Sequence, residues 1–110
     1  MHTSVAKTKS GWQANTRIDM GNDRILRITT AKGLDGSLCT TALVHHVVQD
    51  SGYRVERHQT RSDYGRRMIQ WNVRSTEKQV RAQHSLALDM VDDMLPAIAK
   101  HYGVDSVSTI

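Results

Sequence analysis

The sequence predicts a single α+β domain, in the order β-β-α-β-β-α, with a four-stranded antiparallel sheet and two helices packed on one face. Two pairs of short segments alternate apolar and polar residues with a period of two, and turn-forming residues separate the members of each pair. Two longer segments space their apolar residues as one face of a helix does. The 110 residues, 38% hydrophobic and 24% charged, suit one globular core. We place the domain at 15–103, between flexible segments at 1–14 and 104–110.

The first pair of segments predicts a β-hairpin. Polar and apolar residues alternate in 17–20 and again in 26–30, and between them lie the turn-forming residues Gly21, Asn22 and Asp23. A loop with two glycines follows at 31–37.

The spacing of residues 38–50 favours a helix that follows this loop. Asp35 or Ser37 would cap its N-terminus and Gly52 would end it. At about 100° per residue one side of the helix would carry Thr40, Leu43, Val44, Val47 and Val48. The valines and threonines of this stretch argue for a strand, but less strongly.

The second hairpin is predicted from residues 53–59 and 66–74, which alternate around a turn-rich stretch at 60–66. The last helix has the clearest signals. Thr76 and Gln79 have the spacing of a capping box. An apolar stripe then runs through Val80, Ala87, Leu88, Val91, Met94 and Leu95. Pro96 would kink the helix or restart it, and Gly103 would end it.

Candidates for catalysis are few, and the sequence predicts a protein that is not an enzyme and that has no catalytic residue, metal or cofactor. His45 and His46 would lie on the solvent side of the first helix, and no second ligand pair completes a metal site. His84 stands inside the apolar stripe, where we expect a hydrogen-bonded core histidine rather than a proton-transfer group. Cys39 has no neighbouring base, and no phosphate-binding or nucleophile-elbow motif is present.

Location and assembly can also be predicted. No apolar run approaches the roughly 20 residues that cross a bilayer, so we expect no membrane partner. Cys39 is the one cysteine, which favours a reducing compartment, the cytoplasm. Two sheet edges, with Met68 and Leu86 outside the main apolar stripes, suggest a homodimer, or else a monomer that uses these positions for another protein.

The strongest functional signal is an uneven charge. Residues 54–81 carry eight Lys and Arg against three acids, although the net charge of the whole chain is +4. Arginine suits bidentate contacts with phosphate, and Tyr64 would lie in the loop between basic residues, where it could stack on a base. The predicted binding residues are Arg54, Arg57, Arg61, Tyr64, Arg66, Arg67, Arg74, Lys78 and Arg81.

These residues predict a small regulatory or accessory binding protein whose basic hairpin contacts nucleic-acid phosphates. The alternative is a protein–protein adaptor or inhibitor, possibly homodimeric, whose basic hairpin binds an acidic protein surface. A third interpretation, a solvated hairpin whose arginines pair with the acids of the last helix, has equal weight on the sequence alone.

Overall fold

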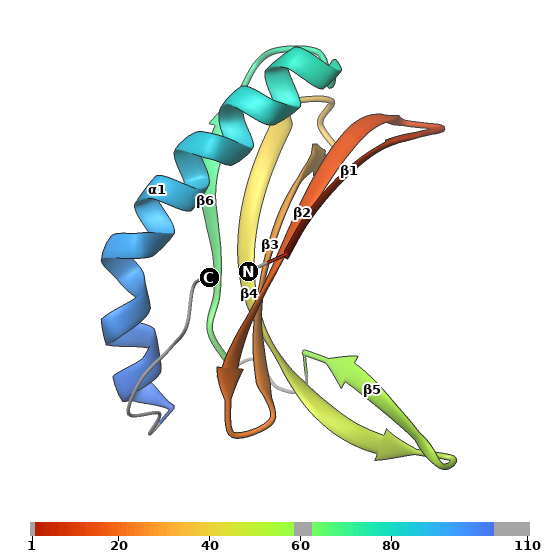
Figure 1. The fold of residues 1–110 in the computed structure, drawn as a ribbon. Coiled ribbons are helices and arrows are strands. Elements are labelled where there is room, and N and C mark those ends of the chain that lie inside the picture. The colour runs from red at the N-terminus through yellow and green to blue at the C-terminus, as the bar shows by residue number, and fades with distance from the viewer. Residues whose placement is uncertain (1, 59–62, 103–110) are drawn as a thin grey trace.

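The computed structural model describes residues 2–58 and 63–102, and within them six antiparallel strands form one curled sheet with a single helix on its concave face (Figure 1). The elements are β1 (His2–Thr8), β2 (Gly11–Gly21), β3 (Arg24–Lys32), β4 (Leu38–Asp50), β5 (Tyr53–Arg57), β6 (Gly65–Trp71) and α1 (Glu77–His101). The predicted four-stranded sheet with two helices is therefore wrong. Over its described residues the domain is mostly β, with one helix as its α component.

The first predicted hairpin is confirmed as β2 and β3. Ile18 pairs with Leu26, and both side chains face the helix in the main core. The turn residues Asn22 and Asp23 have φ angles of 55° and 58°, the left-handed conformation that a tight hairpin turn requires.

The N-terminal residues form a strand where the sequence suggested a flexible segment. All seven residues of β1 pair with β2, and Lys9 and Ser10 make the two-residue connection between Thr8 and Gly11. Because β1 has only Val5 as a clear apolar residue, its alternation is too weak to detect in the sequence.

Residues 38–50 form strand β4 rather than the predicted helix. This strand pairs with β3 along one edge through residues 38–46, and along its other edge with β6 and then with β5. Thr40, Ala42 and Val44 are fully buried on one face of the strand. Leu43 and Val47 are partly buried on the other face. Because both faces of the strand carry apolar residues, the sequence lacks a clear period of two, and its apolar residues have the spacing expected of a helix.

The second predicted hairpin is also wrong, because β5 and β6 do not pair with each other. β6 pairs with residues 38–43 of β4, and β5 pairs with residues 46–50 farther along the same edge. The far half of β4 bends with β5 away from α1 and toward the convex side of the sheet (Figure 1).

The C-terminal helix begins as predicted, with Thr76 as its N-cap and the Gln79 N–H donating to the Thr76 hydroxyl over 3.3 Å. It continues through Pro96 to His101, so it does not restart at the proline. The predicted end at Gly103 lies outside the described residues, as does the predicted C-terminal tail. No helix in the described part of the chain has the length and apolar character needed to span a membrane.

The core lies between the concave face and α1, in two clusters. The main cluster extends toward the C-terminal half of the helix and contains Ile18, Met20, Leu26, Ile28, Ala42, Val44, Ala87, Val91, Leu95, Ile98 and Ala99. The second lies near the start of the helix and consists of Ala14, Leu38 and Val80, with partly buried Val5, Trp12 and Val73 against them.

We predict that Ile28→Ala will destabilise the protein by about 2–4 kcal/mol, because this fully buried side chain would leave a cavity between the sheet and α1. Leu34→Ala is the matched control, since Leu34 is fully exposed on the β3–β4 loop and its truncation should change stability by less than about 0.5 kcal/mol. Urea unfolding of both variants measures the difference. Equal stabilities would contradict this placement of the core.

Candidate functional site

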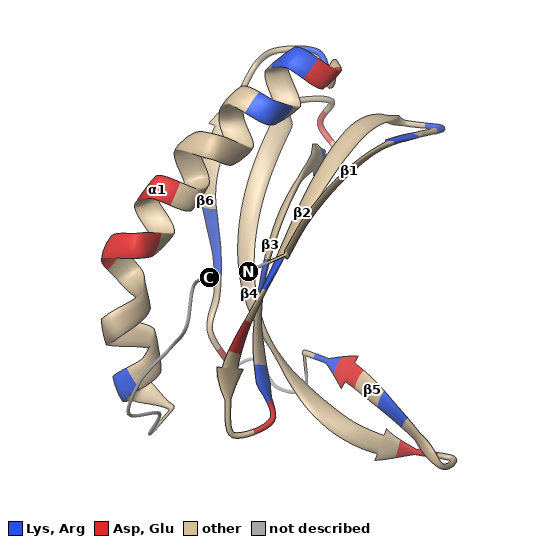
Figure 2. Cartoon of the chain, viewed as in Figure 1, with Lys and Arg blue, Asp and Glu red and all other residues tan. Residues whose placement is uncertain are grey.

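Six basic residues lie at the end of the molecule where α1 begins, and we call this region the basic end (Figure 2). They come from four parts of the chain: β1 and its turn, the last residue of β3, the connection from β6 to α1, and the first turns of α1. The basic end consists of Lys7, Lys9, Lys32, Arg74, Lys78 and Arg81.

A hollow of about 510 Å³ opens at the basic end. Lys32 and Arg74 line it together with Asn72 and Ser75, and no acidic residue is among the described residues that line it. Two cations and the Asn72 amide therefore border the hollow, which is a suitable environment for an anion.

The segments around this hollow are tied to each other. The Trp12 backbone N–H donates to the Ser75 carbonyl over 2.9 Å, and the Ser75 hydroxyl donates to the Ser10 carbonyl over 3.3 Å. Gly11 permits this approach, because a Cβ atom there would lie 1.9 Å from the Ser75 Oγ and because its φ of +126° disfavours other residues. The β1–β2 turn and the β6–α1 connection are thereby held in a fixed relation.

The two acids near the basic end are already engaged. Glu77 forms an ion pair with Arg81 one helical turn away, at 3.0 Å. Asp35 accepts hydrogen bonds from the Ser37 hydroxyl at 2.6 Å and from the Gln70 amide at 2.9 Å. The Ser37 hydroxyl and then its backbone N–H lower the pKa of Asp35, so its carboxylate stays charged.

Among the described residues, the remaining cations of the basic end form no such ion pair. These five residues take part in none of the ion pairs found in residues 2–58 and 63–102: Lys7, Lys9, Lys32, Arg74 and Lys78. Five positive charges are thus available to a ligand.

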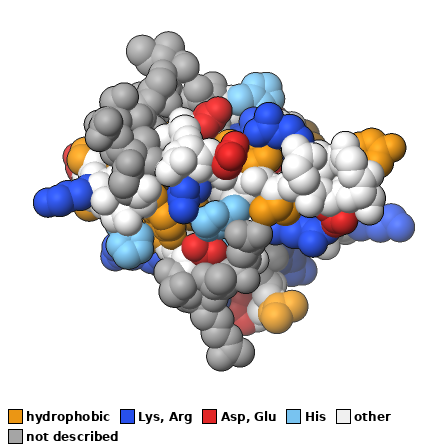
Figure 3. Space-filling view, turned by 90° about the horizontal axis from the view of Figure 1, so that it is seen from below, with side chains coloured by type: hydrophobic (Ala, Val, Ile, Leu, Met, Phe, Trp, Pro, Cys, Tyr) orange, Lys and Arg blue, Asp and Glu red, His pale blue; other side chains and the backbone are white. Residues whose placement is uncertain are grey.

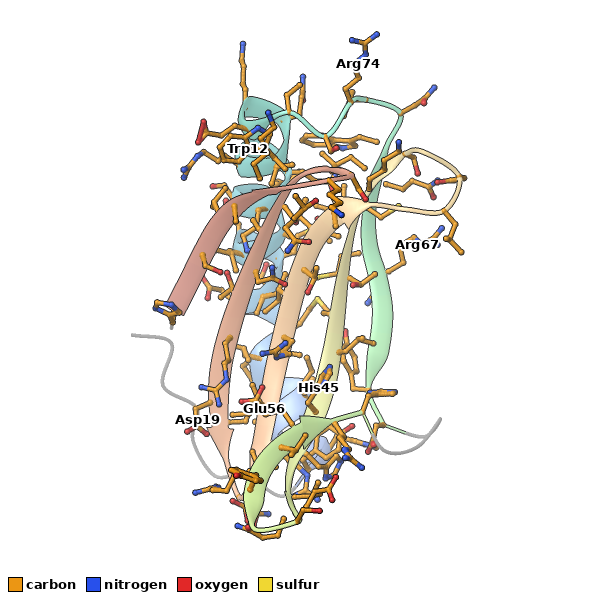
Figure 4. The ribbon with its side chains drawn as sticks, turned by 90° about the vertical axis from the view of Figure 1, so that its right-hand side faces the viewer. Trp12, Asp19, His45, Glu56, Arg67 and Arg74 are labelled. Atoms are coloured by element: carbon orange, nitrogen blue, oxygen red, sulfur yellow. The ribbon has the colours of Figure 1, made fainter. Side chains whose placement is uncertain are left out.

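The structure divides the basic residues that the sequence grouped together. Arg74, Lys78 and Arg81 belong to the basic end, and Arg67 lies on β6 with its guanidinium donating to the Gln70 side chain (Figure 4). Arg66 is exposed on the same strand. Arg61 lies outside the described residues.

The other predicted binding residues lie elsewhere. Arg54 and Arg57 are on β5, where Arg54 pairs with Asp23 at 3.3 Å and Arg57 pairs with Asp50. Tyr64 packs against the main core and its hydroxyl is buried, so it does not project from a basic loop.

Lys7, Lys9 and Lys32 were not among the predicted binding residues. They lie in the first half of the chain, far from residues 54–81 in sequence, and only the pairing of β1, β2 and β3 brings them to the same end. No local pattern in the sequence could have assigned them to this surface.

The opposite end of the molecule has a mixed charge (Figure 3). Glu56 on β5 accepts hydrogen bonds from Arg17 and from Arg27, and the bond from Arg27 is 3.0 Å long. These contacts lower the pKa of Glu56, and the hydrogen bond from Arg17 has the largest effect. These contacts fasten the bent β4–β5 hairpin to the convex face. The hollow of about 490 Å³ beside them is bordered by both acids and arginines, among them Asp19 and Arg54, so it shows no preference for one sign of charge.

The histidine pair does not lie on the solvent side of a helix, as predicted, but on opposite faces of β4. His45 is partly buried on the convex face, where burial and then the nearby Arg27 charge lower its pKa. His46 faces the other way and lies 2.9 Å from an Asp63 carboxylate oxygen. Two adjacent strand residues cannot direct their rings at one ligand, and the described residues contain no group of three side chains placed to hold a metal ion.

His84 is a hydrogen-bonded core histidine, as expected, and the hydrogen bonds assign its proton. The Gln83 amide donates to the Leu38 carbonyl at 2.9 Å, so its oxygen accepts from the Thr40 hydroxyl at 2.7 Å. Thr40 must then accept from Thr30, at 2.6 Å, and Thr30 must accept from the His84 Nδ1–H, at 2.7 Å.

The chain of hydrogen bonds continues on the other side of the imidazole. The neutral ring accepts at Nε2 from the Thr16 hydroxyl at 2.6 Å, and Thr16 in turn lies 2.7 Å from the hydroxyl of Thr3. The ring is thus enclosed by hydroxyl groups, and burial lowers its pKa. Cys39 is likewise buried, with its sulfur 3.3 Å from the Ser37 hydroxyl.

The comparisons with known proteins add no information about this site, because no protein family, curated protein or solved structure matches the chain.

We predict that the protein loses stability as the pH falls below about 6.5, the ordinary pKa of histidine. His84 has a lowered pKa in the folded state, so below pH 6.5 the unfolded chain binds a proton that the folded chain does not. Each pH unit then removes up to about 1.4 kcal/mol until the folded pKa is reached. His84→Gln keeps a donor and an acceptor, and urea unfolding at pH 7.5 and 5.5 should show a smaller loss of stability in this variant than in the wild type.

His45 contributes in the same direction, because its pKa is lowered too, so the variant should retain part of the effect. An unchanged pH dependence in His84→Gln would contradict the assignment of a neutral, buried imidazole.

Proposed function

We propose that this protein is a non-enzymatic regulatory or accessory protein that binds nucleic-acid phosphates through its basic end. The observation that carries this proposal is that five cations lie at one end of the fold and that none of them is in an ion pair among the described residues: Lys7, Lys9, Lys32, Arg74 and Lys78. Two of these cations, Lys32 and Arg74, border a hollow that no described acid lines. The proposed contact surface is therefore the basic end, whereas the sequence predicted a single basic hairpin.

An extended polyanion suits the basic end better than a small anion does. Its cations are spread over a turn, a strand end, a connection and a helix start, whereas a single phosphate would need them around one point. The phosphates of a nucleic acid are spaced along a backbone and can contact several of these cations together. Such binding depends strongly on salt and weakly on base sequence.

The fixed geometry of the basic end also supports binding. The hydrogen bonds that join Ser75 to Trp12 and to Ser10 hold the segments in place before a ligand arrives. Less conformational entropy is then lost on binding, and more of the electrostatic attraction appears as affinity.

One observation favours the second candidate function, a protein adaptor or inhibitor that binds an acidic protein surface. Leu34 is fully exposed at the tip of the β3–β4 loop, next to Lys32 and Asp35. The loop is braced, since the Gly33 N–H donates to the Ser37 carbonyl at 2.8 Å. An exposed apolar side chain on a braced loop, two residues after Lys32, could contact an apolar group on a protein partner. For either function we propose a cytoplasmic location, to which the single buried Cys39 is suited.

We expect the wild type to bind fluorescein-labelled single-stranded or duplex oligonucleotides in a fluorescence-anisotropy titration at about 50 mM salt, and to bind far more weakly at about 200 mM. The triple variant Lys32→Ala/Arg74→Ala/Lys78→Ala should bind at least about tenfold more weakly, and the salt slope should fall by about 0.9 for each lost phosphate contact.

The matched control is Arg54→Ala/Arg57→Ala/Arg66→Ala, which removes the same charge from outside the basic end and should retain most of the affinity. Equal losses in both triple variants would show an effect of net charge alone and would overturn the assignment to the basic end. Binding of polyglutamate but of no oligonucleotide would replace the first function by the second.

A further inference from the structure

The outer edge of β1 presents unpaired backbone groups. Because Lys9 and Ser10 form a two-residue turn, Thr8 and Gly11 are the hydrogen-bonded pair that closes the hairpin. Pairs then alternate along the strand, so the backbone N–H and C=O groups of Thr3, Val5 and Lys7 point away from β2.

The contacts of Trp12 agree with this alternation. Trp12 is the partner of Lys7 in the register, yet its N–H donates to the Ser75 carbonyl on the other side of β2. The pair is therefore of the non-hydrogen-bonded kind, and the backbone groups of Lys7 face outward. In the described part of the chain, no other strand pairs with this edge.

The two edges of the sheet differ in their protection. On the far edge, β6 has an irregular register opposite Thr40 and Thr41 and carries two exposed arginines, while β5 is only five residues long and bends away. β1 has seven residues in regular register, with no bulge and no proline, and its one Lys or Arg residue is Lys7. Proteins that remain monomeric usually protect such an edge with one of these devices.

We propose that two copies of this chain associate through β1, strand against antiparallel strand, about a two-fold axis at Val5. This register pairs the whole strand from residue 2 to residue 8, whereas a two-fold axis at any other position shortens the overlap. Val5 would exchange two backbone hydrogen bonds with Val5 of the second copy. Thr3 and Lys7 would do the same in each direction, which gives about six hydrogen bonds in all.

The side chains are compatible with this register on both faces of the sheet. On the helix side, Val5 packs against the second core cluster, so pairing with its own copy would join the two apolar clusters across the axis. Lys7 would lie opposite Thr3 rather than opposite a second lysine. On the other side, Ser4 would lie opposite Ala6, and no like charges would meet.

The edge of β1 pairs better with β1 of a second copy than with β6, on the far edge of the sheet of that copy. Pairing of β1 with β6 would be head to tail and would have to accommodate the irregular register and the arginines. Pairing of β1 with itself closes after two copies and covers the unprotected edges of both.

Charge placed at Ser4 and Ala6 tests both the interface and its register. Both residues are exposed in one chain and face uncharged partners in β2, Asn15 and Gln13, so substitution should leave the fold intact. In the proposed dimer each Ser4 lies opposite an Ala6. We expect Ser4→Lys/Ala6→Lys and Ser4→Glu/Ala6→Glu to dissociate the dimer, because like charges would meet twice.

The matched control, Ser4→Lys/Ala6→Glu, places opposite charges together and should retain the dimer. Sedimentation velocity at micromolar concentration measures the mass, with circular dichroism to verify the fold. The wild type and the control should sediment at twice the 12.4 kDa of one chain, and the two like-charged variants at 12.4 kDa.

A wild-type monomer would overturn the proposal, as would a dimer that survives in both like-charged variants. A control that dissociates with them would overturn the register. None of these outcomes depends on nucleic-acid binding, which is measured separately with oligonucleotides.

Discussion

The whole structure depends on one helix covering the concave face of the sheet, and a row of polar side chains sets where that helix lies. Thr16, Thr30 and Thr40, from three neighbouring strands, bind His84 and Gln83 of α1 between the two apolar clusters. A shift of the helix along the sheet would keep much of the apolar contact but would leave these buried groups unsatisfied, at about 1–3 kcal/mol each. The network therefore specifies the register of the helix, which apolar packing alone would leave open.

That register also determines the position of the candidate site. With His84 fixed against β2 and β3, the first turn of α1 lies beside the β1–β2 turn, where Ser75 bonds to Trp12 and Ser10. Lys78 and Arg74 are thereby placed at the same end of the molecule as Lys7 and Lys32. The contact of His84 with β2 and β3 therefore also determines the arrangement of the basic end. A displaced helix would separate Arg74 and Lys78 from Lys7 and Lys32.

The sequence predicted those elements whose signals are local. The capping pair Thr76 and Gln79 and the turn after β2 were both identified, since each depends on residues three or four positions apart. Strand β4 was mistaken for a helix because it has two pairing partners on one edge and is partly buried on both faces, which removes the alternation that identifies a strand. The basic end was half identified for a related reason: Arg74 and Lys78 lie in the basic segment, while Lys7 and Lys32 reach it only through long-range strand pairing.

Antiparallel pairing of β1 has a consequence for how a dimer would bind an anion. The strand runs toward the basic end in each copy, so a two-fold axis at Val5 sets the two basic ends at opposite ends of one continuous sheet. A short oligonucleotide could then contact only one of them, and two would bind independently. A ligand gains avidity from the second site only if it is long enough to bend around the dimer, or if the dimer joins two separate segments. The proposed assembly therefore suits a protein that bridges anionic chains better than one that grips a single short site.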